Sequence, residues 1–345
     1  MAKRWKNRPE GSTWGDWGED DQLGRLNLLT PEKVWQGLME VKEGRSFCLS
    51  LPLDYPGGNA LNARRFPPVL SPTGDAGEPR FNFPTARLDP HYTDIVSDDR
   101  VLLTLQYSTQ WDTLAHVGSM FDADGDGVPE PVYYNGWRAG KDVIGPHDYG
   151  HGANPDRPPT ANKLGVENMA VKAIQGRGVL VDLEKHFGRE HRHVGYDELM
   201  HVIEADKVEV ETGDMLVLHT GFATWVLECG KQIDPKRAHA TCAVLNGRDK
   251  KLLQWITDSG IACLIADNYG VEAVPALPSQ EDHHAWLPLH EHCLFKLGCN
   301  LGELWYLDEL AHFLRARKRS RFLLTAPPLR LPGAVGSPAT PVATA

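Results

Sequence analysis

The feature that most constrains the fold is a series of short apolar runs, each of which ends in polar residues. Three of them, "RGVLVDLEKHF" (177–187), "DMLVLHTG" (214–221) and "IACLIADNYG" (261–270), begin with the apolar pattern of buried strands. Between them, "DKKLLQWITDSG" (249–260) predicts an amphipathic helix that Gly260 closes. Mixed strands and helices predict an α/β fold, in which functional groups gather where strands end.

The N-terminal part of the chain has a different character. Residues 1–98 are predicted to form an extension and arm that packs on the core or on a partner subunit. Within it, "TPEKVWQGLMEVKEG" (30–44) predicts a helix and "RSFCLSLPLD" (45–54) a strand. The segment 55–98 is rich in proline and shows no period, which is typical of an extended, functional loop or arm.

A single catalytic domain is predicted over residues 99–325. The last residues, 326–345, have the low-complexity composition of a disordered tail or of one held loosely to the surface. These boundaries predict one domain with an appendage at each end.

Composition excludes several function classes. The net charge of −10 and the absence of a basic stripe argue against a nucleic-acid partner. No window approaches the roughly 18 to 20 apolar residues of a membrane span, and no secretory signal is visible, so we expect no membrane partner and a cytoplasmic location. The six cysteines form no CxxC pair, which indicates small core residues in a reducing compartment.

The stretch "QYSTQWDTLAHVGSMFD" (106–122) carries the first candidate for chemistry. Asp112 follows a strand-like run and can ligate a divalent metal, and His116 can move protons near neutral pH. The alternative is that Asp112 caps a turn while His116 packs on a helix. Gln106 and Gln110 stand where many metal hydrolases carry histidines.

The next stretch resembles half of a calcium loop. Asp122, Asp124 and Asp126 match its opening ligands, but the twelfth position is Tyr133 instead of the bidentate glutamate. Glu130, at the ninth position, compensates only in part. A tight turn built from Asp and Gly is the commoner explanation of such a pattern.

Further polar groups lie near the ends of later segments. "EDHHAWLPLHEH" (281–292) is either a metal-binding histidine cluster or a polar loop. Glu303 lies in an apolar run, where a charge is costly unless it is paired or bound to metal. His219 and Asn268 end buried strands and are either site groups or turn formers. No GxSxG, HExxH, Walker or GxGxxG motif is present, which argues against serine hydrolases, kinases and nicotinamide dehydrogenases.

Taken in order, five motifs make the chain similar to the putative cyclase family, which includes bacterial kynurenine formamidases and isatin hydrolases. The resemblance covers roughly residues 100–312 and implies a swivelling β/β/α fold. It also implies subunits that pair and exchange arms, so we expect a homodimer or homotetramer. The motifs are "STQWDTLAHVG", "GRGVLVDL", "VETGDMLVLHTGF", "IADNYGVEA" and "LHEHCLFKLGCNLGELWYLDEL".

The first family motif contains two histidines, an aspartate and a third histidine. On this chain the first two positions are Gln106 and Gln110, the aspartate is Asp112 and the last histidine is His116. The resemblance implies metal binding by the first three positions and an acid/base role for His116.

The resemblance also implies a late glutamate and a late histidine as metal ligands. Glu303 matches the glutamate, and His290 matches the histidine better than His292 does.

Replacement of histidine by glutamine changes the expected metal content. A glutamine amide oxygen is a much weaker ligand than imidazole, so a two-metal site is lost or severely weakened. We expect Asp112, His290 and Glu303 to hold one divalent ion, manganese or zinc, with the oxygen of Gln110 as a marginal fourth ligand.

The family resemblance therefore predicts a hydrolase of a small cyclic amide, lactone or formamide-type bond, that is, a C–N or ester bond, with His116 as acid/base. Two alternatives remain open from the sequence. One is a metal-independent lyase, dehydratase or isomerase that uses Asp112 and His116; the other is a non-catalytic relative that binds a small molecule. Four residues are predicted to contact the substrate: Gln110, Trp111, Tyr134 and Asn268.

Overall fold

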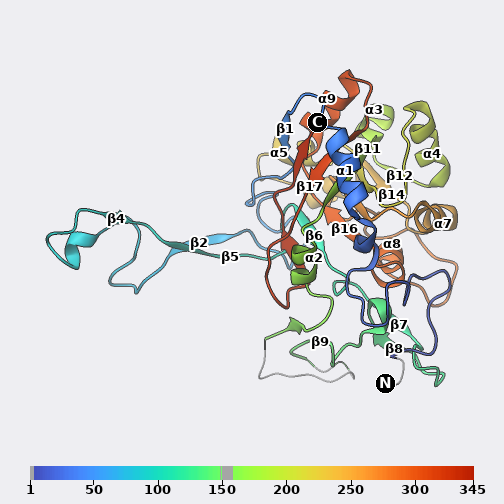
Figure 1. Ribbon diagram of the computed structural model, residues 1–345, viewed down its shortest axis with the longest axis horizontal. Coiled ribbons are helices and arrows are strands. Elements are labelled where there is room, and N and C mark those ends of the chain that lie inside the picture. Colours follow the sequence, from blue (N-terminus) through green and yellow to red (C-terminus); the bar gives the residue numbers. More distant parts are fainter. Residues whose placement is uncertain (1–3, 148, 150–157) are drawn as a thin grey trace.

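The computed structural model describes residues 4–147, 149 and 158–345. Its body is a single α/β unit formed around a mixed nine-stranded sheet (Figure 1), which confirms the predicted fold class. The four strands β11, β13, β15 and β16 run parallel, and the strands on either side of them pair antiparallel. In spatial order the strands are β1 (Ser46–Cys48), β19 (Val342–Thr344), β17 (Arg321–Thr325), β11 (Gln175–Asp182), β13 (Met215–His219), β15 (Cys263–Ala266), β16 (Asn300–Glu303), β6 (Gln110–Asp112) and β18 (Gly336–Pro338).

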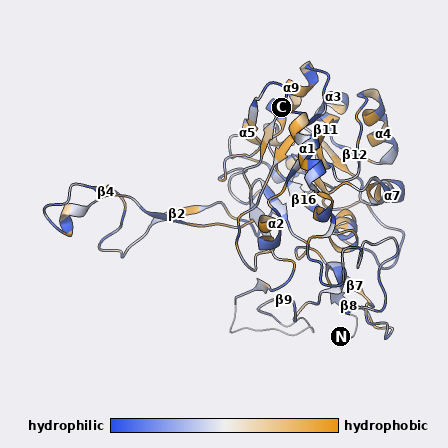
Figure 2. Ribbon diagram, in the orientation of Figure 1, coloured by the Kyte–Doolittle hydropathy of each residue, from blue (hydrophilic) through white to orange (hydrophobic). Residues whose placement is uncertain are grey.

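Both faces of this sheet are covered, as the apolar runs predict. Along β11, Val179 and Val181 belong to one core cluster and Leu180 to the other, because successive side chains of a strand point to opposite faces. Each buried side chain of this size stabilises the fold by about 1.5–3 kcal/mol. Figure 2 shows the resulting hydrophobic strands in the middle of the body.

Helices form the outer layers. Helices α4 and α7 bury apolar side chains in the first cluster, and α2 and α9 in the second, while α1 packs on β11 and β17. The helices are α1 (Pro31–Met39), α2 (Val166–Lys172), α3 (Leu183–Phe187), α4 (Tyr196–Ala205), α5 (Phe222–Glu228), α6 (Pro235–Ala238), α7 (Lys250–Ser259), α8 (Pro288–His290) and α9 (Asp308–Ala316), with 3-10 turns η1 (Gly24–Leu28), η2 (Thr85–Arg87) and η3 (Tyr134–Gly136) and the π-helix η4 (Glu291–Lys296). None of the described helices is long and apolar enough to cross a bilayer.

Helix α7 follows its sequence signals closely. The Asp249 side chain accepts hydrogen bonds from the backbone N–H groups of Lys251 and Leu252, which caps the first turn. Gly260 ends the helix in the left-handed region, with φ of 66°, where glycine has no side-chain penalty. The predicted helix 249–260 therefore agrees with the structure to within one residue at each end.

The N-terminal extension divides into two parts. Residues up to about 54 pack on the body; Trp14, for example, is fully buried and its indole N–H donates to the Phe295 carbonyl at 2.8 Å. The segment 55–104 leaves the body as a long arm (Figure 1), in which β2 (Val69–Pro72) pairs with β5 (Asp99–Leu102) and β3 (Phe83–Pro84) with β4 (Ile95–Val96). Three more two-stranded ribbons lie elsewhere: β7 (Ser119–Phe121) with β8 (Glu130–Val132), β9 (Val143–Ile144) with β10 (Thr160–Ala161), and β12 (Arg192–Val194) with β14 (Ala243–Leu245).

The prediction of a loosely held tail over 326–345 is wrong. Strand β19 lies between β1 and β17, and β18 pairs with β6, the strand that carries Asp112. Ala343, Ala345 and Ser337 are fully buried. Small residues and prolines gave this segment a low-complexity composition, but its backbone hydrogen bonds make it an integral part of the sheet.

Candidate active site

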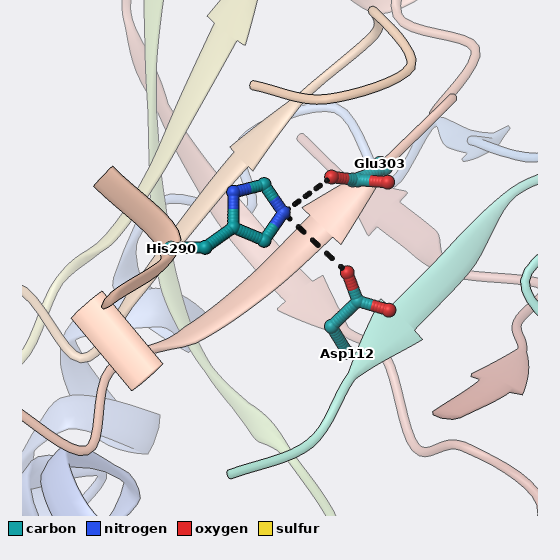
Figure 3. A group of neighbouring side chains, drawn as sticks. All are labelled: Asp112, His290 and Glu303. Carbon is teal, nitrogen blue, oxygen red and sulfur yellow. Dashed lines mark ion pairs between the residues drawn. The ribbon is translucent and has the colours of Figure 1, made fainter. Parts of the chain in front are cut away.

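Two neighbouring strands and one helix bring the candidate ligands together (Figure 3). Asp112 ends β6 and Glu303 ends β16, and these strands pair antiparallel so that Glu303 lies directly opposite Gln110. His290 reaches the same point from α8. Because strand side chains alternate, Gln110 and Asp112 face the site together, while Trp111 between them faces the opposite side of the sheet.

The functional atoms of these three residues converge. The His290 Nε2 atom lies 3.2 Å from Glu303 Oε1 and 4.0 Å from Asp112 Oδ2. Asp112 Oδ2 and Glu303 Oε1 are buried and have no hydrogen-bond partner among the described residues. Two carboxylate oxygens are thus held away from water and aimed at one imidazole nitrogen, an arrangement that is costly unless a cation or a proton lies between them.

The other atoms of the three residues are held in place by further partners. The Gln110 amide nitrogen donates to Glu303 Oε2 at 2.8 Å and to Asp112 Oδ1 at 3.3 Å. Glu272 Oε1 lies 2.8 Å from His290 Nδ1 and also accepts the backbone N–H of His290. Gln110 and Glu272 therefore orient the ligands and leave Oδ2, Oε1 and Nε2 free to face one another.

The buried histidine and carboxylates shift one another's pKa values. Burial lowers the pKa of His290, but the neighbouring carboxylates of Glu272 and Glu303 outweigh burial and raise it to about 10. Burial and the nearby Asp112 carboxylate raise the pKa of Glu303 to about 6. The proton on His290 therefore occupies the position from which a divalent ion would neutralise the charge of both carboxylates. A metal ion would have to displace that proton in order to bind.

The residues present fit a divalent metal ion. Atoms that each lie about 2.1 Å from one zinc ion are at most about 4.2 Å apart, and both distances from His290 Nε2 satisfy this limit. The three ligand atoms lie within 4.8 Å of one another. A carboxylate on the second nitrogen of the histidine, here Glu272, is the usual support of a metal-binding imidazole.

Gln110 takes a role other than the predicted one. As a fourth ligand it would present its oxygen to the metal, but its amide nitrogen contacts the two carboxylates, and its oxygen is buried with no hydrogen-bond partner among the described residues. Gln106 lines the cavity and lies against the tail: a Cβ atom on Gly336 would come within 2.5 Å of its amide nitrogen. Neither glutamine occupies a ligand position in this geometry.

His116 borders the metal group without belonging to it. Its Nε2 atom is 3.8 Å from Asp112 Oδ2, too far for a hydrogen bond, and its side chain is 20% exposed. Burial lowers the pKa of His116, although Asp112 opposes the shift. A neutral imidazole beside the candidate metal position, open to the cavity, can accept a proton.

A large open cavity of about 1490 Å³ leads to these groups. His116, His290 and Glu303 lie on its wall together with Gln106. Apolar side chains on the same wall include Met120, Phe121, Trp286 and Leu304. The cavity combines a few convergent polar groups with apolar surface, as small-molecule sites do.

Three of the predicted substrate contacts do not reach this cavity. Trp111 is fully buried, packs edge-on against Trp305 and donates its indole N–H to the Ala326 carbonyl. Tyr134 is fully buried in the core, with its ring against Gly298. Asn268 is buried and donates to the Ala243 carbonyl at 3.2 Å. The structure places all three in supporting roles, because their side chains fill the interior.

The structure also shows where His292 and the calcium-like loop lie. His292 lies 2.9 Å from the Thr257 hydroxyl and outside the ligand group, whereas His290 lies within it. In the calcium-like loop, Asp122 accepts the backbone N–H groups of Gly125, Asp126 and Gly127, and Glu130 pairs with Arg138 at 2.7 Å. The loop is thus a capped turn, in which ligand atoms of Asp122, Asp124 and Glu130 also lie within 4.8 Å of one another.

Sequence reasoning missed Glu272. The signal was present in "GVEAVP" (270–275), where a carboxylate stands between apolar residues just after a buried strand. The burial argument that singled out Glu303 applies equally here, since a buried charge needs a partner.

Comparison with known proteins agrees with the fold. A family model described as putative cyclase matches residues 48–273. A crystal structure described as that of a novel cyclase is 30% identical, superposes with a TM-score of 0.72 and covers 97% of each chain. The chain therefore belongs to the putative cyclase family.

More distant structures share the fold. Isatin hydrolase A from Labrenzia aggregata is 14% identical, with a TM-score of 0.53 over 87% of this chain and 93% of that chain. The enzyme of the same name from Ralstonia solanacearum is also 14% identical, with a TM-score of 0.54 over 87% of this chain and 91% of that chain. No curated protein matches this chain.

Proposed function

We propose that the protein is a hydrolase that opens a small cyclic amide, lactone or formamide-type bond with the help of one divalent metal ion, manganese or zinc. The observation that carries the proposal is the convergence of Asp112 Oδ2, Glu303 Oε1 and His290 Nε2. The two oxygens are buried and have no hydrogen-bond partner among the described residues. Two structural relatives named isatin hydrolases support the reaction class.

A divalent ion bound there supplies Lewis acidity, which lowers the pKa of water and polarises a carbonyl group. The chain's own residues do the rest. Gln110 and Glu272 hold the side chains that would bind the metal in fixed orientations. The buried surroundings of Asp112 and Glu303 exclude competing water from the ligand oxygens.

His116 is the acid/base in this proposal. Its lowered pKa keeps the imidazole neutral at pH 7, so Nε2 can take the proton of the attacking water. The same nitrogen then gives that proton to the leaving nitrogen or oxygen. The 3.8 Å separation from Asp112 leaves His116 without a fixed hydrogen bond to the carboxylate, which disfavours a metal-free Asp112–His116 pair.

The test is a turnover assay on lactones, cyclic imides and N-formyl amines, with protein purified without added metal. We expect hydrolysis that a chelator removes and manganese or zinc restores. His116→Ala should lower kcat at least 100-fold, the range of a lost general base, and leave the metal content unchanged. His312→Ala is a matched control, because that histidine is exposed and lies outside the ligand group.

Full activity in chelator would instead select the metal-free lyase or isomerase. Binding of a ligand without turnover of any compound in the panel would select a non-catalytic relative. Either result would refute the proposed hydrolase.

The arm supports assembly of two or more copies. Its paired residues Val69 and Leu102 are 60% and 77% exposed, and Leu70 and Val101 beside them are exposed as well. A two-stranded ribbon is marginally stable alone, and a second copy of the chain would bury these side chains. Leu70→Glu should shift the mass measured by light scattering from dimer or tetramer to monomer, whereas Arg100→Glu on the same ribbon should not.

We also place the protein in the cytoplasm. All six cysteines are free thiols, as is usual in a reducing compartment. Fractionation of cells that produce the tagged protein tests this placement.

A further inference from the structure

The cations around the cavity differ in how fully they are already paired. Arg248 donates to the carbonyls of Leu277 and Ala285, and Lys250 forms an ion pair with Glu281 at 3.0 Å. Both hold the loop 277–286 in place. Arg64, Arg65 and Lys296 also line the cavity, and none of them forms an ion pair among the described residues. Of these three, Arg65 is the one whose charge acts on both His116 and Glu303.

Arg65 lies at the root of the arm and lines the cavity together with His116 and Glu303. Its Nη1 donates to the Gln106 carbonyl at 2.8 Å, and no partner is recorded for its other guanidinium N–H groups within the described chain. The side chain is half-buried. It is close enough to the site for its positive charge to lower the pKa of both His116 and Glu303.

The root of the arm fixes the position of this guanidinium. The Phe66 N–H donates to Thr104 Oγ1 at 3.1 Å. The Tyr107 hydroxyl accepts the Gly57 N–H and donates to the Gly58 carbonyl. Arg65 is therefore held at the cavity wall by its own backbone as well as by Gln106, although the arm itself extends away from the body.

The free donors of Arg65 make it a binding group for an anion. A divalent ion would neutralise Asp112 and Glu303, and Glu272 lies behind His290, so none of these three carboxylates would take up the free donors of Arg65. A guanidinium with several free donors matches a carboxylate, which it binds in a fork with two parallel hydrogen bonds.

We propose that the substrate carries a carboxylate in addition to the bond that is cleaved, and that Arg65 binds this carboxylate and so determines specificity. The inference rests on the proposed hydrolase function of the same cavity. It narrows the substrate class to anionic lactones and cyclic amides, and it explains why the arm begins at the mouth of the site.

A matched pair of substrates tests this inference. One is the γ-lactone of 2-hydroxyglutarate, which carries a ring carboxylate; the other is its carboxamide, which has the same ring without the charge. Hydrolysis adds one water across the ester C–O bond and yields 2-hydroxyglutarate or its amide. Arg65→Gln should lower kcat/KM for the acid 10- to 100-fold, mainly through KM, since a hydrogen bond to a charged group contributes about 1.5–3 kcal/mol.

The same substitution should change kcat/KM for the carboxamide less than threefold. Arg64→Gln is the control, because this neighbour also lines the cavity but is exposed; it should leave both substrates within threefold. Equal losses on both substrates, or faster hydrolysis of the carboxamide by the unmodified protein, would overturn the role of Arg65 while leaving the hydrolase proposal intact.

A binding measurement separates failure of the two proposals. Calorimetry with 2-hydroxyglutarate should give a dissociation constant that Arg65→Gln raises at least tenfold and Arg64→Gln does not. If neither lactone is hydrolysed but this binding difference is found, the proposed activity fails and the carboxylate site stands. If the unmodified protein does not bind 2-hydroxyglutarate, or both variants bind it equally well, the carboxylate site is refuted.

Discussion

Replacement of Gln110 by glutamate distinguishes a metal ligand from a residue that holds the ligands. If the Gln110 oxygen bound metal, a carboxylate at this position would bind it more tightly, because a charged oxygen is the better ligand. In the structure, however, the Gln110 nitrogen donates to Glu303 at 2.8 Å and to Asp112 at 3.3 Å. Glutamate cannot make these contacts when ionised, so the structure predicts weaker metal binding in Gln110→Glu.

The magnitude follows from the distances. Two like charges about 3 Å apart repel by roughly 5 kcal/mol at an effective dielectric constant of 20. Protonation of a glutamate at pH 7 costs only about 4 kcal/mol, so the new side chain would carry a proton. Its single O–H donor can serve Glu303 or Asp112 but not both. Loss of one hydrogen bond to a buried carboxylate, about 1.5–3 kcal/mol, corresponds to roughly 10- to 100-fold weaker metal binding.

The assay is a competition titration of metal-stripped protein with zinc or manganese in the presence of a chelating dye. Gln106→Glu is the matched control, because Gln106 lines the cavity outside the ligand group, and its dissociation constant should change less than threefold. Thermal unfolding in chelator checks that both variants fold. Tighter metal binding by Gln110→Glu would refute the supporting role of Gln110.

Three more predictions concern pH and the tail. Burial raises the pKa of Asp182, but hydrogen bonds from His219 and Arg315 outweigh it and lower the pKa to about 2. Asp182 should therefore contribute about 2 kcal/mol to the free energy of unfolding, a contribution that is present above pH 4 and lost as the pH falls toward 2. Chemical unfolding of Asp182→Asn should show a flatter pH dependence in that range. The acid limb of turnover should lie below pH 6.5, since the lowered pKa of His116 keeps it unprotonated to lower pH, and a limb above 6.5 in a pH–rate profile would contradict this environment. Removal of residues 334–345 should lower the free energy of unfolding by roughly 3 kcal/mol or more, because several buried backbone hydrogen bonds at about 1 kcal/mol each are lost. An unchanged melting temperature would instead indicate a loosely held tail.

The parts that could be predicted from sequence depend on local signals. Helix α7 has its cap, its apolar spacing and its closing glycine within twelve residues of sequence, and the buried strands β11, β13 and β15 are recognisable as apolar runs. The burial argument for Glu303 needed only its apolar neighbours. Motif alignment favoured His290 over His292, and in the structure the His292 side chain extends from η4 toward Thr257 and lies outside the ligand group.

The parts that sequence could not give depend on pairing between distant segments. Strands β18 and β19 have three residues each, and only their contacts with β6, β1 and β17 make them strands. The orientation of the Gln110 amide is likewise decided by Glu303, which is 193 residues further along the chain. Trp111 was predicted to contact substrate from its position in the motif, but the alternation of a strand turns it into the core.

The central claim is that Asp112, His290 and Glu303 form one metal site, and metal titration with the two neighbouring histidines tests it most directly. Metal-stripped protein should bind one manganese or zinc ion per chain. His290→Ala should weaken binding at least 100-fold, because it removes one of three protein ligands, whereas His292→Ala should bind like the unmodified protein. Equal affinity in both variants, or no metal binding by the unmodified protein, would contradict the site.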